Sequence, residues 1–244
     1  MKFTPRDRLI VALDTDNLDS AKKIVGQLGD SVSIYKVGIQ LFTAVGPEIL
    51  DWLAKKKKKV FLDLKFHDIP RSVAQAGVSV LKKNVFMFNL HLAGGEAMIK
   101  ETVKKVREFS KKQGKKPPLI IGVTVLTSLV GEDLKRMGID RDLSSLVLEL
   151  ASLGKRAGLD GVVASAREAK TIKEKLGGDF LVVTPGIRPS KASFDDQKRI
   201  TTPKEAIASG ADFLVVGRPI TQSVDPVKSA KEILLELERA QDAY

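Results

Sequence analysis

The feature that most constrains the fold is a regular alternation of short apolar runs with longer amphipathic segments. Eight runs are rich in Val, Ile, Leu and Phe and are bounded by Gly, Pro or charged residues, as buried parallel strands are. They occupy residues 9–13, 33–37, 60–64, 87–92, 119–125, 161–165, 180–184 and 213–217.

Segments with the apolar spacing of helices follow these runs. They occupy residues 19–28, 47–56, 73–83, 96–112, 143–157, 167–176, 203–209 and 226–239. Thr202 and Pro203 supply a helix cap followed by proline at the first helical position. Eight strand–helix units in 244 residues predict an α/β protein, a (β/α)8 TIM barrel built as a single domain over residues 1–244.

A doubly wound open sheet is the competing architecture. Such a sheet usually carries a glycine-rich turn after its first strand if it binds a dinucleotide, and the segment ALDTDNLDS contains no glycine. The chain also shows no low-complexity linker and no short repeat beyond the strand–helix alternation. These observations favour one barrel domain.

The absence of cysteine excludes disulfides, thiolate nucleophiles and cysteine-bound metals, and it is typical of a reducing compartment. The only apolar run near the start, residues 9–13, is far shorter than the roughly 18–20 residues that a membrane span needs. We therefore expect a cytoplasmic protein with no signal peptide and no membrane partner.

The chain is basic, with 41 Lys and Arg against 30 Asp and Glu and a net charge of +11. Much of the excess falls where helices are expected to end, at 55–59 and 111–116, and cations there complement the helix dipole. A nucleic-acid surface more often interleaves basic and aromatic residues, and this chain has one Trp and two Tyr. We expect a solvated basic surface and no nucleic-acid partner.

Charged residues stand at the ends of the first three predicted strands, where barrel enzymes place their chemistry. These are Asp14, Lys36 and the pair Asp63 and Lys65, which alternation along a strand places on one face. Asp68 follows in the loop before the next helix. A buried ion pair that only closes the barrel is the alternative, but such pairs are seldom kept for stability alone.

A lysine flanked by carboxylates stays protonated, so Lys65 is a candidate proton donor. The two histidines, His67 and His91, form no nucleophilic triad and no spacing typical of a metal site. We expect no metal and no cofactor.

The loops after the last two predicted strands, TPGIRPS and VVGRPITQS, each place an arginine soon after a glycine. Barrel enzymes often bind phosphate with these loops, so Arg188 and Arg218 are candidate phosphate ligands. Two arginines on ordinary turns are the alternative. The long connections 127–138 and 185–201 are expected to act as lids over a polar ligand. The residues alone thus indicate a barrel enzyme that grips a phosphomonoester and offers it a proton.

The segment FLDLKFHDIP at 61–70 matches the D-x-K-x-x-D signature of the orotidine 5'-phosphate decarboxylase family. Further motifs follow that family's order along nearly the whole chain: IVALD, YKVG, VTVLTS, GLDGVV, VTPGIRP, DDQKRITTP and VVGRPITQSVDP. The chain therefore resembles this family. The resemblance implies decarboxylation of orotidine 5'-monophosphate to UMP and CO2 in pyrimidine biosynthesis, without metal or cofactor, by a homodimer with shared sites.

The resemblance also implies roles for individual residues. Lys65 would protonate C6, Asp63 would lie beside the leaving carboxylate, and Asp68 would reach in from the partner subunit. Asp14 and Lys36 would hold ribose hydroxyls. The other implied substrate contacts are Ile69 and Ser72, Thr127 and Ser128 at the pyrimidine, and Arg188, Gln197, Gly217 and Arg218 at the phosphate. Many bacterial relatives have threonine in place of Ser72, a change that keeps the hydroxyl.

Two other functions compete with this interpretation. Hexulose-phosphate synthase and ketogulonate-phosphate decarboxylase share the D-x-K-x-x-D barrel but use magnesium. The VLTS loop and the GIRP and DQKR segments favour the nucleotide enzyme. The other alternative, a basic nucleic-acid-binding protein, would lose affinity steeply with salt.

Overall fold

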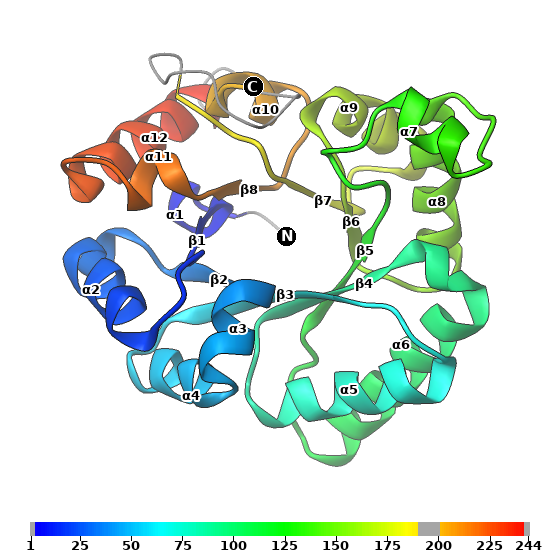
Figure 1. Ribbon diagram of the computed structural model, residues 1–244, viewed down its shortest axis with the longest axis horizontal. Helices are drawn as coiled ribbons and strands as arrows, with labels where there is room; N and C mark the ends of the chain where they lie inside the picture. The colour runs from blue at the N-terminus through cyan, green and yellow to red at the C-terminus, as the bar shows by residue number, and fades with distance from the viewer. Residues whose placement is uncertain (1–2, 190–200, 242–244) are drawn as a thin grey trace.

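The computed structural model describes residues 3–189 and 201–241 and shows a closed parallel barrel surrounded by helices (Figure 1). Each strand pairs with its neighbours in sequence, and β1 closes the barrel against β8. The predicted TIM barrel is therefore confirmed. The strands are β1 Leu9–Ala12, β2 Ile34–Gly38, β3 Lys59–Phe66, β4 Met87–His91, β5 Leu119–Val123, β6 Gly161–Val163, β7 Leu181–Thr184 and β8 Phe213–Val216.

The predicted helices are all present and form the outer ring in Figure 1. Helix α5 begins three residues earlier than predicted, because Pro70 takes its first position. Thr202 caps α10 and exchanges hydrogen bonds with Glu205, as in a capping box. The helices are α2 Leu18–Leu28, α4 Glu48–Lys55, α5 Pro70–Lys82, α6 Gly95–Lys112, α8 Leu143–Arg156, α9 Ala166–Leu176, α10 Pro203–Ala208 and α12 Pro226–Gln241.

Several short helices were not predicted from the sequence. They are α1 Pro5–Arg8, α3 Ile39–Val45, α7 Gly131–Arg136, α11 Arg218–Thr221 and the 3-10 turns Gly29–Ser31 and Leu92–Gly94. Each spans two turns or fewer, too short for an apolar period to stand out. Helix α3 ends at Gly46, whose φ of 65° is in the left-handed region and separates it from α4. Helix α7 lies within the connection 127–138 that was expected to be a lid.

The strands divide the apolar core into two layers. On β1, Ile10 and Ala12 face the barrel interior, whereas Leu9 and Val11 face the helices. Because this alternation has a period of two, the inward residue that follows the last apolar layer lies at the mouth of the barrel. The strands thereby aim their terminal side chains at one point.

Strand β3 departs from regular pairing with β4. Leu62 pairs with Phe88 and Phe66 with Leu90, so β3 uses four residues where β4 uses two, and this part of β3 is a bulge. Lys65 lies in this bulge with φ of 52°, a left-handed conformation. The side chains nevertheless alternate: Leu62, Leu64 and Phe66 pack against the outer core, whereas Asp63 and Lys65 line the cavity described below. The prediction that Asp63 and Lys65 lie on one face of the strand is therefore confirmed.

The lysine run 55–59 extends beyond the end of a helix, and its later members make contacts of their own. Helix α4 ends at the first of these lysines. Lys58 donates hydrogen bonds to the carbonyls of Gly29 at 2.6 Å and Val32 at 3.0 Å, and Lys59 is already the first residue of β3. The later lysines of the run thus tie adjacent segments together at the N-terminal end of the barrel.

Carboxylates at the same end join neighbouring strands. Asp212 accepts the N–H of Val182 at 2.7 Å and pairs with the Lys173 ammonium at 2.7 Å. Asp160 likewise accepts the N–H of Ile120 at 2.8 Å.

In the described ranges, no helix has the length and apolarity needed to cross a membrane.

Replacing Asp212 with alanine should lower the free energy of unfolding by about 2 kcal/mol, because a strand N–H loses its acceptor and the shielded Lys173 ammonium keeps only carbonyl partners. Urea denaturation measures the change. Exposed Asp179 precedes β7 at the same end of the barrel, and Asp179→Ala is the control. Equal stability losses in the two variants would contradict a joining role for Asp212.

Candidate active site

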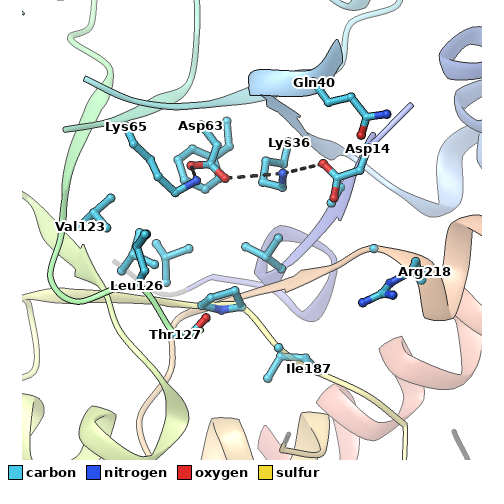
Figure 2. A pocket seen from close by; sticks show the side chains of 18 of the residues that line it. Asp14, Lys36, Gln40, Asp63, Lys65, Val123, Leu126, Thr127, Ile187 and Arg218 are labelled. Atoms are coloured by element: carbon cyan, nitrogen blue, oxygen red, sulfur yellow. Dashed lines mark hydrogen bonds and ion pairs between the residues drawn. The ribbon is translucent and has the colours of Figure 1, made fainter. Parts of the chain in front are cut away.

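A cavity of about 450 Å³ lies at the C-terminal ends of the strands (Figure 2). Its walls combine charged groups with the apolar side chains that top the barrel core. Eight residues singled out from the sequence line it: Asp14, Lys36, Asp63, Lys65, Thr127, Arg188, Gly217 and Arg218. Charged strand ends and arginine loops therefore share one site.

Four charged side chains run along one wall of this cavity with alternating sign (Figure 2). The Lys65 ammonium is 2.7 Å from Oδ1 of Asp63. The Lys36 ammonium is 3.5 Å from Oδ2 of Asp63 and 2.8 Å from Oδ1 of Asp14. We call Asp14, Lys36, Asp63 and Lys65 the charged array. Its members come from β2, from β3 and from the segment that follows β1.

Asp63 is the most enclosed carboxylate of the array, with 9% of its surface exposed. Burial alone would raise the pKa of Asp63, but the ammonium groups of Lys36 and Lys65 and hydrogen bonds from Lys65 and Asn89 outweigh it. The net effect holds the pKa of Asp63 below its usual range. Asp63 therefore stays ionised at neutral pH.

Gly38 makes room for the array. A Cβ at this position would lie 2.9 Å from the Lys36 ammonium and 3.4 Å from Oδ1 of Asp14. The φ of Gly38 is −94°, a value open to any residue, so its backbone does not require glycine. The missing side chain is what lets the Lys36 ammonium lie between two carboxylates.

Asn89 on β4 was missed by the sequence analysis. Its side chain is fully buried and contacts both Asp63 and the backbone of Lys65. The signal was present, because Asn89 shares the inward face of an apolar run with Met87. Gln40 on α3 also lines the cavity beside Asp14 and was not predicted.

The two histidines lie next to each other beside the array, with ring centroids of His67 and His91 5.5 Å apart. Burial lowers the pKa of His91, and the neighbouring His67 and Lys65 lower it further. His91 is therefore neutral at pH 7.

The arginines define another part of the cavity. Arg188 is 7% exposed, and its backbone N–H donates to the carbonyl of Thr201 at 3.0 Å. Gly217 precedes α11, and Arg218 is its first residue. Figure 2 shows Arg218 on the Asp14 side of the cavity, away from Lys65. The site thus has the Lys65 ammonium near one end and the Arg218 guanidinium near the other.

Other predicted residues do not line this cavity. Asp68, Ile69, Ser72 and Ser128 are exposed, and Oδ1 of Asp68 accepts the N–H of Ile69 at 2.6 Å. Gln197 and most of the predicted lid at 185–201 lie outside the described residues.

Within residues 3–189 and 201–241, no three or more His, Asp or Glu side chains form a group that could hold a metal ion. The oxygens of Asp63 instead face two ammonium groups and an amide. The charged part of the site thus consists of lysine ammonium groups and their carboxylate partners.

Gly38→Ala should displace the Lys36 ammonium, because the new methyl group would overlap it. The pKa of Asp63 should then rise, because one of its two neighbouring ammonium groups, that of Lys36, moves away. A carbon-13 NMR titration of the Asp63 carboxyl measures the shift. Gly26→Ala is the control, because a Cβ there meets no atom within 4 Å. An unchanged pKa in Gly38→Ala would contradict the role given to Gly38.

Comparison with known proteins places these features in a family. The model of the Orotidine 5'-phosphate decarboxylase / HUMPS family matches residues 7–233. The Orotidine 5'-phosphate decarboxylase of Syntrophotalea carbinolica is 49% identical over 240 residues, 98% of each chain. That of Moorella thermoacetica is 45% identical over 239 residues, 98% of this chain and 95% of the relative.

A solved structure gives the same result. The crystal structure of Orotidine 5'-phosphate decarboxylase from Lactobacillus acidophilus is 37% identical, covers 94% of this chain and 98% of its own, and superposes with a TM-score of 0.84. Sequence, fold and site agree, and the chain belongs to the Orotidine 5'-phosphate decarboxylase / HUMPS family.

Proposed function

We propose that this chain decarboxylates orotidine 5'-monophosphate to UMP and CO2 in pyrimidine biosynthesis, with Lys65 as the proton donor. The observation that carries the proposal is the single cavity that joins the charged array to Arg188 and Arg218. A phosphate dianion fits the guanidinium groups. The base then lies toward Lys65.

The reaction breaks the bond between C6 of the pyrimidine and its carboxylate carbon. CO2 leaves, and the electron pair of that bond stays on C6. The Lys65 ammonium stabilises this negative charge and then transfers a proton to C6. Lys65 becomes a neutral amine and regains its proton from water.

The other members of the array bind and orient the substrate. Asp14 and Lys36 hold ribose hydroxyls, and Asp63 lies beside the departing carboxylate. Asp63 also holds the Lys65 ammonium at 2.7 Å, which keeps the proton donor in place before the reaction.

The remaining contacts follow from the family motifs. Thr127, which lines the cavity, and the exposed Ser128 that follows it contact the pyrimidine. The phosphate is bound by Arg188, Gln197, Gly217 and Arg218. Binding of the phosphate, remote from C6, supplies free energy that orients the base against Lys65.

The proposed reaction uses no metal. The oxygens of Asp63 are already directed at the cations of Lys36 and Lys65, which supports this assignment because a metal ion would compete with them. The magnesium-dependent sugar-phosphate enzymes that share the D-x-K-x-x-D barrel are the alternative.

Purified protein should therefore consume orotidine 5'-monophosphate at the same rate with and without an exhaustive chelator. Loss of the orotate absorbance in the ultraviolet measures the rate. No turnover, or turnover lost on chelation and restored by magnesium, would favour the sugar-phosphate enzymes.

Lys65→Ala should lose at least about 10²-fold in kcat, because general acid catalysis typically contributes 10²–10⁴-fold. The variant should still bind UMP, because the phosphate and ribose contacts remain. Steady-state kinetics and isothermal titration with UMP measure the two effects.

Lys57→Ala is the matched control for that variant. Lys57 is an exposed lysine with φ of 57°, close to the 52° of Lys65, so both substitutions remove a lysine from a left-handed backbone. Turnover of Lys65→Ala within about tenfold of the control would contradict the proton-donor role.

The functional unit that we propose is a cytoplasmic homodimer with sites shared across the interface. Asp68, Ile69 and Ser72 are exposed and lie outside the cavity of their own chain, which supports a role in the site of a second subunit. The absence of cysteine supports a reducing compartment.

Mixing Lys65→Ala chains with Asp68→Ala chains tests the sharing. In a hybrid dimer one site lacks both residues, whereas the other takes Lys65 from one chain and Asp68 from the other and is complete. Hybrid dimers should approach half of the wild-type activity per dimer, measured after isolation with two affinity tags. Activity no higher than the parental average would place Asp68 in the site of its own chain.

A further inference from the structure

The Asn89 side chain is a polar group inside the apolar barrel. It lies on β4 with no exposed surface, on the inward face that also carries Met87. Burying a carboxamide among apolar side chains costs free energy unless its donors and acceptor are satisfied. Here the amide nitrogen and the amide oxygen each make a hydrogen bond to β3.

Both hydrogen bonds reach the residues of the proposed proton transfer. Nδ2 of Asn89 donates to Oδ1 of Asp63 at 2.7 Å. Oδ1 of Asn89 accepts the backbone N–H of Lys65 at 2.8 Å. The partners determine which way the amide faces, because a carboxylate can only accept and a backbone N–H can only donate.

The second bond holds an unfavourable backbone conformation. Lys65 has φ of 52° within the β3 bulge, a conformation that residues with a Cβ seldom adopt. Its N–H cannot enter the regular strand ladder at the bulge, and the Asn89 oxygen replaces that partner. The carboxamide thus fixes the direction in which the Lys65 side chain leaves the strand.

The first bond acts on the same atom that holds the ammonium. Oδ1 of Asp63 accepts from Asn89 and from the Lys65 ammonium, each at 2.7 Å. The Asn89 amide therefore positions Lys65 at two points. It holds the Lys65 backbone directly, and it holds the Lys65 ammonium through Asp63.

We propose that Asn89 is a positioning residue for the proton transfer, and that its carboxamide holds the Lys65 ammonium and the Asp63 carboxylate in the geometry that the reaction needs. This inference rests on the proposed function. Asn89 touches no substrate in this assignment and acts only through Lys65 and Asp63.

Asn89→Ala should lower kcat by about 10- to 100-fold, since a displacement of about 1 Å in a reacting group can cost 10²-fold. KM should change by less than about threefold, because the phosphate and ribose contacts are untouched. Thr102→Val is the control: Thr102 is also fully buried, but its hydroxyl bonds only within α6 to the Met98 carbonyl. The control should lose stability and keep its kcat.

Asn89→Asp is nearly isosteric and tests the donor directly. The new carboxylate can accept the Lys65 N–H, but it cannot donate to Asp63 unless it is protonated. One proton shared by the two carboxyls restores both the hydrogen bond and the single negative charge. The kcat of this variant relative to wild type should therefore rise as pH falls. The charged or titratable neighbours that enter this profile are Asp14, Lys36, Asp63, Lys65, His67 and His91.

A measurement on the ligand-free protein separates this inference from the proposed function. Because the hydrogen bond from Asn89 lowers the pKa of Asp63, Asn89→Ala should raise that pKa. A carbon-13 NMR titration of the Asp63 carboxyl measures the change. If wild type does not consume orotidine 5'-monophosphate, the proposed function fails and this titration still tests Asn89.

Two results would overturn the inference in an active enzyme. One is a kcat for Asn89→Ala equal to that of Thr102→Val, each corrected for the folded fraction. The other is a pH dependence of kcat for Asn89→Asp that runs parallel to that of wild type. This second result overturns the inference even if the alanine variant does not fold.

Discussion

The site depends on keeping one carboxylate ionised where water hardly reaches it. Asp63 is 9% exposed, and burial opposes its charge. It remains an anion because Lys36 and Lys65 flank it and Asn89 donates to it. The dependence is mutual, since each ammonium is held in place by the same carboxylate. Removing one member leaves its neighbours with unpaired charge, a larger loss than one hydrogen bond.

The barrel meets this requirement by keeping the site and the stabilising contacts between strands at opposite ends. At the N-terminal end, Asp212 accepts a strand N–H and joins adjacent strands. At the other end, β2 and β3 place ammonium and carboxylate groups one layer above the apolar interior. Gly38 leaves space for the Lys36 ammonium, and Asn89 supports the bulge. Stability and chemistry are thereby assigned to opposite ends of the same strands.

The fold was predictable because eight buried strands and their helices carry strong apolar periods. The short helices α3, α7 and α11 were not, since two turns or fewer leave no period to read. The site residues at regular strand ends, such as Asp14 and Lys36, were found from position alone. The bulge at Lys65 was not found, because a left-handed lysine has no sequence signature. Asn89 was passed over although its place in an apolar run was visible.

Lys65, the proposed proton donor, has a left-handed backbone. Glycine adopts this conformation freely, whereas a residue with a Cβ pays about 1–2 kcal/mol for it. Lys65→Gly would relieve the backbone, but it would also take one of its two ammonium partners away from the buried Asp63 carboxylate. The strained lysine and the buried carboxylate are therefore energetically coupled. Substitutions at these two positions should be non-additive, because the effect of changing one depends on whether the other is still present.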